Sequence, residues 1–245
     1  MPRDVEQLGQ VFTPPNVVAF MLDLCSNKGR TLEPSAGDGA FFNELKSRQA
    51  DCVGIEVDPS VAPEGALVRD FFDFPLSEQF DSIVGNPPYV RFQDVTVNTK
   101  KRLKSDLFDA RSNLFLFFIE KCIRHLKPGG ELVFIVPREF IKLTAAKKLN
   151  AWLFEQGSIT HFYETGDVRV FDGATPNCAI FRFEKGRKDR RMADGRRFVE
   201  ADGQLMFLRD DHSLRFADVF AVKVGAVSGA DEIYVSDRDG NRDFV

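Results

Sequence analysis

Cysteines are scarce in this 245-residue sequence, and none is spaced as metal ligands usually are. The four cysteines are widely separated and form no C-x-x-C motif, and Cys52 and Cys178 lie in apolar stretches, as buried thiols do. Disulfide frameworks and zinc sites need closer, paired spacings. We therefore predict a protein of a reducing, cytoplasmic compartment without a metal site.

Long apolar runs and an excess of positive charge are also missing. No apolar stretch approaches the roughly 20 residues of a membrane-spanning helix, and the N-terminus has no signal-peptide pattern. The net charge is −4, so a surface for nucleic acid would have to be a local patch. The apolar fraction of 43% is ample for a core. We expect a soluble globular protein with no membrane partner.

What the sequence does contain is an alternation of strand and helix patterns. A first strand-like segment begins the stretch 31–42, and others lie at 52–58, 80–85, 131–137, 158–163 and 177–183, with a further short strand ending near Val68. Helix-like segments lie at 16–24, 41–45, 112–126 and 144–156. This order predicts an α/β fold, with a mostly parallel sheet, an antiparallel C-terminal edge and helices on both faces. We expect one domain at 1–213, followed by a linker or the start of a second domain at 214–245.

Asn86-Pro87-Pro88-Tyr89 stands at the end of the predicted strand 80–85. The two prolines restrict the backbone and remove hydrogen-bond donors, so the turn is stiff and continues neither strand nor helix. In open α/β sheets, ligands bind at the carboxyl ends of the strands. The motif therefore predicts an amide and a phenol ring held rigidly at a ligand-binding edge.

A glycine-containing loop follows the first predicted strand. Gly37 and Gly39 let the backbone approach a ligand where a Cβ would collide. The complete G-x-G-x-x-G motif that cradles phosphates is missing. The loop carries Glu33 and Asp38 instead, and carboxylates suit a cationic ligand better than NAD or ATP. A plain turn between strand and helix is the alternative.

Acidic residues stand at the ends of the next two strands. An acid about twenty residues after such a loop commonly binds a ribose diol. Glu56 and Asp58 are both candidates, and we prefer Glu56 because it lies nearer the strand. Asp70 can accept a hydrogen bond from an adenine amino group, with Phe71 against the ring. The alternative for these acids is a solvated strand end.

Two segments allow two interpretations each. Thr13-Pro14-Pro15 fits either a helix entry or a contact with a cofactor. The polar, basic stretch 90–109 fits either a solvated face or a contact with phosphates. A second basic run, 185–191, predicts a solvent-exposed hairpin tip.

In residues and in order, these motifs resemble the S-adenosylmethionine-dependent DNA adenine-N6 methyltransferases of restriction–modification systems. The resemblance spans about 11–183, in the arrangement where the cofactor motifs precede the catalytic motif and target recognition comes last. It implies a Rossmann-like methyltransferase sheet with S-adenosylmethionine as cofactor. The residues that it assigns to the cofactor are Thr13, Glu33, Pro34, Ala36, Gly37, Gly39, Glu56, Asp70, Phe71 and Asn86, and those that it assigns to catalysis are Asn86, Pro87, Tyr89 and Phe171.

The resemblance also implies a reaction and partners. A methyl group would pass to the N6 amino group of an adenine flipped out of double-stranded DNA. Asn86 and Pro87 would accept hydrogen bonds from that amino group, and Tyr89 and Phe171 would stack on the base. Partners would be DNA and a cognate restriction endonuclease or recognition subunit. RNA or protein glutamine as substrate, and a non-catalytic cofactor-binding subunit, are the alternatives.

The sequence departs from the family at its C-terminal end. Family members carry a large C-terminal target-recognition domain. Here 222–230 resembles the start of that region, and the sequence ends soon after. We therefore expect a fragment, or one half of a split enzyme, with little that could select a DNA sequence.

Overall fold

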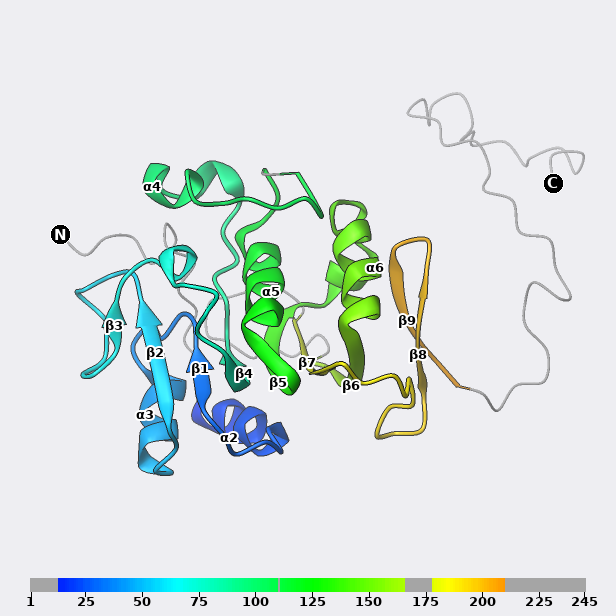
Figure 1. The fold of residues 1–245 in the computed structure, drawn as a ribbon, viewed down its shortest axis with the longest axis horizontal. Helices are drawn as coiled ribbons and strands as arrows, with labels where there is room; N and C mark the ends of the chain where they lie inside the picture. The colour runs from blue at the N-terminus through cyan, green and yellow to red at the C-terminus, as the bar shows by residue number, and fades with distance from the viewer. Residues whose placement is uncertain (1–12, 110, 166–177, 210–245) are drawn as a thin grey trace, which may run out of the picture. The chain divides into compact units, whose positions relative to one another are not determined.

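A seven-stranded sheet forms the centre of the fold (Figure 1). The computed structural model describes residues 13–109, 111–165 and 178–209. In spatial order the strands are β3 (Leu67–Val68), β2 (Cys52–Glu56), β1 (Thr31–Glu33), β4 (Phe80–Gly85), β5 (Leu126–Pro137), β7 (Cys178–Lys185) and β6 (Gly157–Glu164). β1 to β5 pair in parallel, whereas β7 is antiparallel to both β5 and β6. The predicted sheet with its antiparallel C-terminal edge is confirmed.

Helices cover both faces of the sheet, as predicted (Figure 1). They are α2 (Pro15–Leu24), α3 (Ala40–Ser47), α5 (Leu114–His125) and α6 (Lys147–Gln156). α2 and α3 share one core with Val84 and Ile135, whereas α5 and α6 share another with Ile83 and Phe134. Neighbouring strand residues point to opposite cores, which explains why β5 is a continuous apolar run through its centre.

Short helical turns connect several of these elements. They are η1 (Phe71–Asp73), η2 (Phe92–Asp94), α4 (Val97–Lys100), η3 (Arg138–Lys142) and η4 (Thr144–Ala146). None of the helices in the described segments is long and apolar enough to cross a membrane. The predicted domain boundary at 213 lies outside the described residues and stays a prediction.

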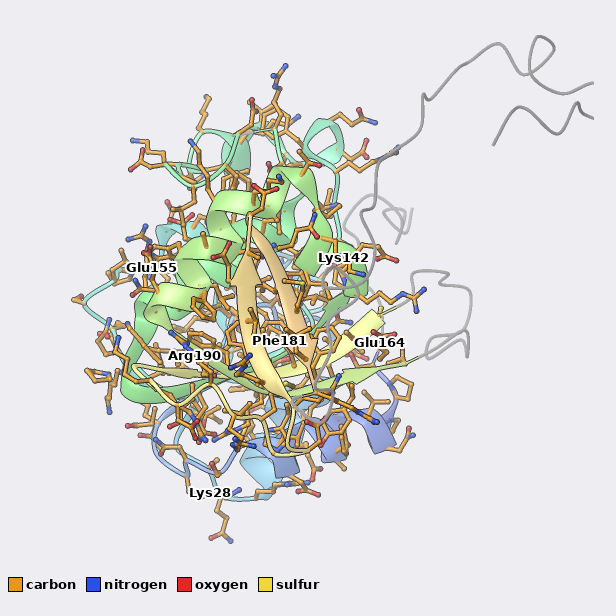
Figure 2. All side chains as sticks on the ribbon, turned by 90° about the vertical axis from the view of Figure 1, so that its right-hand side faces the viewer. Lys28, Lys142, Glu155, Glu164, Phe181 and Arg190 are labelled. Carbon is orange, nitrogen blue, oxygen red and sulfur yellow. The ribbon has the colours of Figure 1, made fainter. Side chains whose placement is uncertain are left out.

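A small hairpin that was not among the predicted elements packs on α6. It consists of β8 (Arg197–Ala201) and β9 (Gln204–Leu208), and Figure 2 shows Arg190 beside it. The Arg190 guanidinium lies 4.0 Å from the centroid of the Phe154 ring and donates to the Phe154 carbonyl oxygen at 2.7 Å. The prediction of a solvent-exposed tip at 185–191 was wrong for Arg190, because the Phe154 ring and the carbonyl oxygens of Phe154 and Gly157 bind its cation.

Candidate cofactor and catalytic site

One cavity lies where β1, β2 and β4 end, at their carboxyl edge. It brings together nine of the residues that the sequence predicted for the cofactor: Thr13, Glu33, Pro34, Ala36, Gly37, Glu56, Asp70, Phe71 and Asn86. Gly39, Pro87 and Tyr89 do not line it. Phe171 lies outside the described residues. Among these nine residues the two farthest apart in the chain, Thr13 and Asn86, are separated by 73 residues.

The two glycines of the first loop have different roles. Both have left-handed backbones, with φ of 53° at Gly37 and 90° at Gly39. A Cβ on Gly39 would come within 2.7 Å of the Pro63 side chain, so this glycine allows α3 to begin close to the chain after β2. A Cβ on Gly37 would meet no protein atom within 4 Å, and this glycine lines the cavity. Only Gly37 therefore leaves room for a ligand.

Glu56 joins the glycine loop to the end of β2. Its Oε2 accepts a hydrogen bond from the Gly37 amide at 2.7 Å, and its Oε1 accepts one from the Asp58 amide at 2.8 Å. Asp58, the other acid considered for the ribose, also lines the cavity and accepts from the hydroxyl and amide of Ser60. Both acids therefore line the cavity. Glu56 also holds the glycine-containing loop against the end of β2 through its two hydrogen bonds.

Glu33 is a buried carboxyl group with unused hydrogen-bonding capacity. Its side chain is 1% exposed, and its Oε2 has no hydrogen-bond partner among the described residues. Burial, together with the nearby charge of Glu56, raises the pKa of Glu33 well above its ordinary value. A cation in the cavity would supply the missing partner and favour the ionised carboxylate.

Asp70 caps the η1 turn and reaches across to α4. Its Oδ1 accepts from the Phe72 amide at 2.9 Å, and its Oδ2 accepts from the Thr99 hydroxyl at 2.7 Å. Phe71 lines the cavity and stacks on Phe118 of α5, with ring centroids 5.1 Å apart. A carboxylate and an aromatic wall therefore stand together, as an adenine pocket requires.

The Asn-Pro-Pro-Tyr turn is held from two sides. The Asn86 side-chain amide donates to the Thr13 hydroxyl at 3.3 Å, and the Ser35 hydroxyl donates to the Asn86 carbonyl oxygen at 3.3 Å. Thr13 belongs to the Thr-Pro-Pro segment and Ser35 to the glycine-containing loop. Three motifs that are distant in sequence thus meet at one amide side chain.

Tyr89 is anchored away from the cofactor cavity. Its hydroxyl donates to the Ile135 carbonyl oxygen at 2.7 Å, and its ring meets Phe115 edge-on with centroids 6.1 Å apart. Burial raises the pKa of the Tyr89 phenol well above its ordinary value, so the group stays a neutral donor. The position of the Tyr89 ring is therefore determined by the hydrogen bond at its hydroxyl and by the stiff Asn-Pro-Pro-Tyr backbone at its Cα.

Sequence reasoning missed several residues of the cavity wall. Leu114 and Phe118 lie four residues apart on α5, so the helical period places both on the face toward Phe71. The spacing of Leu114 and Phe118 was visible in the sequence, but a helix rich in phenylalanine usually indicates side chains of the hydrophobic core. Thr96 and Thr99 also line the cavity, and no local pattern distinguishes them from other polar residues of 90–109.

Known proteins share this combination of motifs and fold. A profile of the Eco57I restriction-modification methylase family matches residues 45–171, just over half of the chain. The chain belongs to this family. The family is one of restriction-modification methylases.

Two curated relatives extend the similarity of this methylase beyond the profile. Type II methyltransferase M.HincII of Haemophilus influenzae is 34% identical over 189 residues, which cover 74% of this chain and 38% of the relative. Type II methyltransferase M.TthHB8I of Thermus thermophilus is 35% identical over 219 residues, which cover 82% of this chain and 50% of the relative. The chain spans half or less of the length of these relatives.

The fold agrees with a solved structure of the same class. A protein of Listeria monocytogenes described as a class I S-adenosylmethionine-dependent methyltransferase superposes with a TM-score of 0.58 at 20% identity, over 74% of this chain and 62% of that one. At this identity the likeness bears on the fold alone. The methylase has the Rossmann-like class I fold, and its cofactor is S-adenosylmethionine.

The cavity fits this cofactor on structural grounds. S-adenosylmethionine carries positive charge on its sulfonium and ammonium groups, and Glu33 offers a buried oxygen without a partner. Asp38 and Glu56 add two carboxylates to the same wall. The open space beside Gly37 completes a site that would accept a cation without phosphate groups.

Proposed function

We propose that this chain is the catalytic part of a DNA adenine-N6 methyltransferase of a restriction–modification system. The observation that carries the proposal is the position of Asn86, which lines the same cavity as Gly37, Glu56 and Asp70. The amide that can bind an exocyclic amino group therefore borders the place of the methyl donor. The Asn-Pro-Pro-Tyr spelling favours adenine as the target.

In the proposed reaction, the chain's residues bind the cofactor at three points. S-adenosylmethionine, when bound, supplies a methyl group that is already activated by the sulfonium charge. Glu33 would bind its positively charged end, Glu56 its ribose and Asp70 its adenine amino group. Phe71 would lie against the adenine ring. Much of the catalytic effect of the protein is then correct placement of two reactants.

Asn86 and Pro87 would make the target amino group more nucleophilic. The lone pair of the adenine N6 is delocalised into the ring, which makes the nitrogen a poor nucleophile. Two acceptors, the Asn86 side-chain oxygen and the Pro87 carbonyl oxygen, would bind its two N–H groups and favour pyramidal geometry. The same oxygens would stabilise the positive charge that develops on nitrogen as the methyl group arrives.

Tyr89 would receive the flipped base. Extrusion from the duplex costs a few kcal/mol, and stacking on an aromatic ring returns roughly 1–3 kcal/mol. Because the Tyr89 hydroxyl is tied to the Ile135 carbonyl oxygen, the ring is already oriented before a base arrives. Phe171 is proposed as the second wall.

A methyl-transfer assay on three substrate classes tests the proposal. The chain is incubated with radiolabelled S-adenosylmethionine and duplex DNA, RNA or protein, at low salt because non-specific DNA binding is strongest there. Products are hydrolysed and separated by mass spectrometry. N6-methyladenine in DNA is the expected product. Label in RNA or in glutamine would reassign the substrate, and cofactor binding without any transfer would favour a non-catalytic subunit.

A further inference from the structure

The segment that follows the catalytic motif returns to the cofactor cavity. Residues 92–103 contain η2 and α4, and Figure 1 shows α4 on the side of the sheet toward which β2 points. Val95, Thr96 and Thr99 of this segment line the cavity. The segment therefore forms a wall opposite the ends of the strands.

Two contacts attach this wall to the η1 turn. The Thr99 hydroxyl donates to the Asp70 Oδ2 at 2.7 Å, and the Arg102 Nε lies 2.6 Å from the Asp73 Oδ1. A second nitrogen of Arg102 lies 4.0 Å from the Asp70 Oδ2. The hydrogen bond from Arg102 holds the pKa of Asp73 below its ordinary value, so the pair stays charged. We call Thr99 and Arg102, with their two aspartates, the latch.

Thr96 orients the hydroxyl of the latch. As the N-cap of α4, Thr96 accepts a hydrogen bond from the Thr99 amide at 3.2 Å, and its hydroxyl donates to the Thr99 Oγ1 at 3.1 Å. The Thr99 oxygen is thus occupied as an acceptor, and its own proton points at Asp70. The two hydroxyls therefore connect the start of α4 to Asp70, which lines the cavity.

We propose that the latch holds residues 92–103 over the adenine end of the bound cofactor and so determines how long the cofactor stays bound. The inference rests on the proposed role of Asp70 as the adenine acceptor. α4 has four residues, which is too short to be stable alone. Its position therefore depends on tertiary contacts: Val95 and Leu103 flank it in the hydrophobic core, and the latch adds the polar contacts to Asp70 and Asp73.

Three substitutions test the latch. Thr99→Val keeps the shape and removes the hydroxyl, Thr99→Ser keeps the hydroxyl, and Arg102→Gln breaks the ion pair. Cofactor dissociation is measured by chase of radiolabelled S-adenosylmethionine, and affinity by calorimetry, on the complete 245-residue chain. A hydrogen bond to a charged group is worth about 1.5–3 kcal/mol, so we expect Thr99→Val to release the cofactor roughly ten- to a hundredfold faster. Thr99→Ser should restore the native rate.

Arg111→Gln is the matched control. Arg111 pairs with Asp109 on the same stretch of chain, both side chains are mostly exposed, and neither lines the cavity. This variant should leave cofactor dissociation unchanged. Arg102, whose side chain is 35% exposed, provides the same readout if Thr99→Val does not fold.

The outcomes distinguish a failure of the latch proposal from a failure of the proposed methyl transfer. If Thr99→Val and Arg102→Gln release the cofactor at the native rate and only their unfolding midpoints are lowered, the latch contacts stabilise the loop without affecting the cofactor. That result would overturn the proposal. Faster dissociation with no methylation of DNA by the native chain would support the latch and refute the proposed substrate. Faster dissociation together with DNA methylation would support both.

Discussion

Asn86 shows how much of the site depends on single side chains placed by distant contacts. Its side chain touches Thr13, its carbonyl oxygen accepts from Ser35, and it lines the cavity beside Glu56 and Asp70. Asn86 thus joins the Thr-Pro-Pro segment to the glycine-containing loop. We therefore expect substitutions here to act on the reaction more than on the fold.

Asn86→Ala should abolish most methyl transfer while leaving cofactor affinity nearly unchanged. Loss of one preorganised polar group of this kind typically lowers kcat by about 10²–10³-fold. Asn86→Asp keeps an oxygen acceptor and should retain more activity than Asn86→Ala. The measurement is single-turnover methyl transfer together with calorimetric cofactor binding. Full turnover by Asn86→Ala would exclude the role that we assign to the amide.

Substitutions of Tyr89 can distinguish the stacking of its ring on a base from the anchoring of its hydroxyl. Tyr89→Ala removes the ring and should slow methylation of paired adenines by roughly ten- to a hundredfold, the value of one stacking contact. The loss should be smaller on a mismatched adenine, which costs less to flip. Tyr89→Phe keeps the ring and loses only the hydrogen bond to Ile135. Equal losses on paired and mismatched substrates would contradict a stacking role.

At the scale of elements, β5 connects the two halves of the sheet. It pairs with β4 in parallel and with β7 in the opposite direction. Glu131 of β5 and Arg182 of β7 form a buried ion pair at 2.6 Å, with side chains 5% and 8% exposed. Ser26, just after α2, donates its hydroxyl and amide to the same carboxylate. The ion pair therefore joins a helix, a parallel strand and an antiparallel strand.

Arg182→Met should destabilise the fold more than the double variant Glu131→Gln/Arg182→Met. A single substitution leaves Glu131 as a buried charge without its cation, at a cost of about 3–5 kcal/mol. The double variant removes both charges and should recover much of that loss. Urea unfolding of the native chain, both single variants and the double variant gives the coupling energy. Strictly additive effects would mean that the two side chains do not stabilise each other.

At the scale of the whole molecule, the buried His125 side chain should make the free energy of unfolding depend on pH. The His125 side chain is fully buried among Phe71, Phe74 and Phe80. Its Nδ1 faces the Glu78 carbonyl oxygen at 2.8 Å, so Nδ1 carries the proton, and Nε2 has no partner among the described residues. Burial lowers the pKa of His125 from 6.5 to about 4. The folded state therefore keeps the ring neutral.

The free energy of unfolding should fall as the pH drops from 6.5 toward 4. In this range His125 is protonated in the unfolded chain but stays neutral in the folded state. Above pH 6.5 the ring is neutral in both states and has no such effect. Between pH 7.5 and 5 this linkage costs about 2 kcal/mol in the free energy of unfolding. His125→Phe should show a shallower pH dependence in urea unfolding. Identical slopes for the native chain and the variant would contradict the assignment.

Predictability differed between the sheet and the loops. The strands at 80–85 and 131–137 were predictable because buried apolar runs between turn residues allow few other structures. The hairpin β8–β9 was missed although it has a local signal, the two-residue turn Asp202-Gly203 with left-handed backbones. Its packing on α6 and against Arg190 depends on tertiary contacts that no local pattern encodes. The positions of Asp70 and Glu56 at the cavity were predictable because an acid that follows a strand lies at the sheet's ligand-binding edge. Their roles toward the cofactor stay predictions.

The sequence by itself determined the α/β class, the glycine-containing loop and the stiff Asn-Pro-Pro-Tyr turn, because backbone restrictions and side-chain periodicity act over a few neighbouring residues. Only the tertiary structure decided that Asn86 meets Thr13, that Thr99 meets Asp70 and that Tyr89 is anchored at Ile135. These pairs lie 73, 29 and 46 residues apart. Their contacts depend on how the sheet orders its strands, and that order results from burying both faces at once.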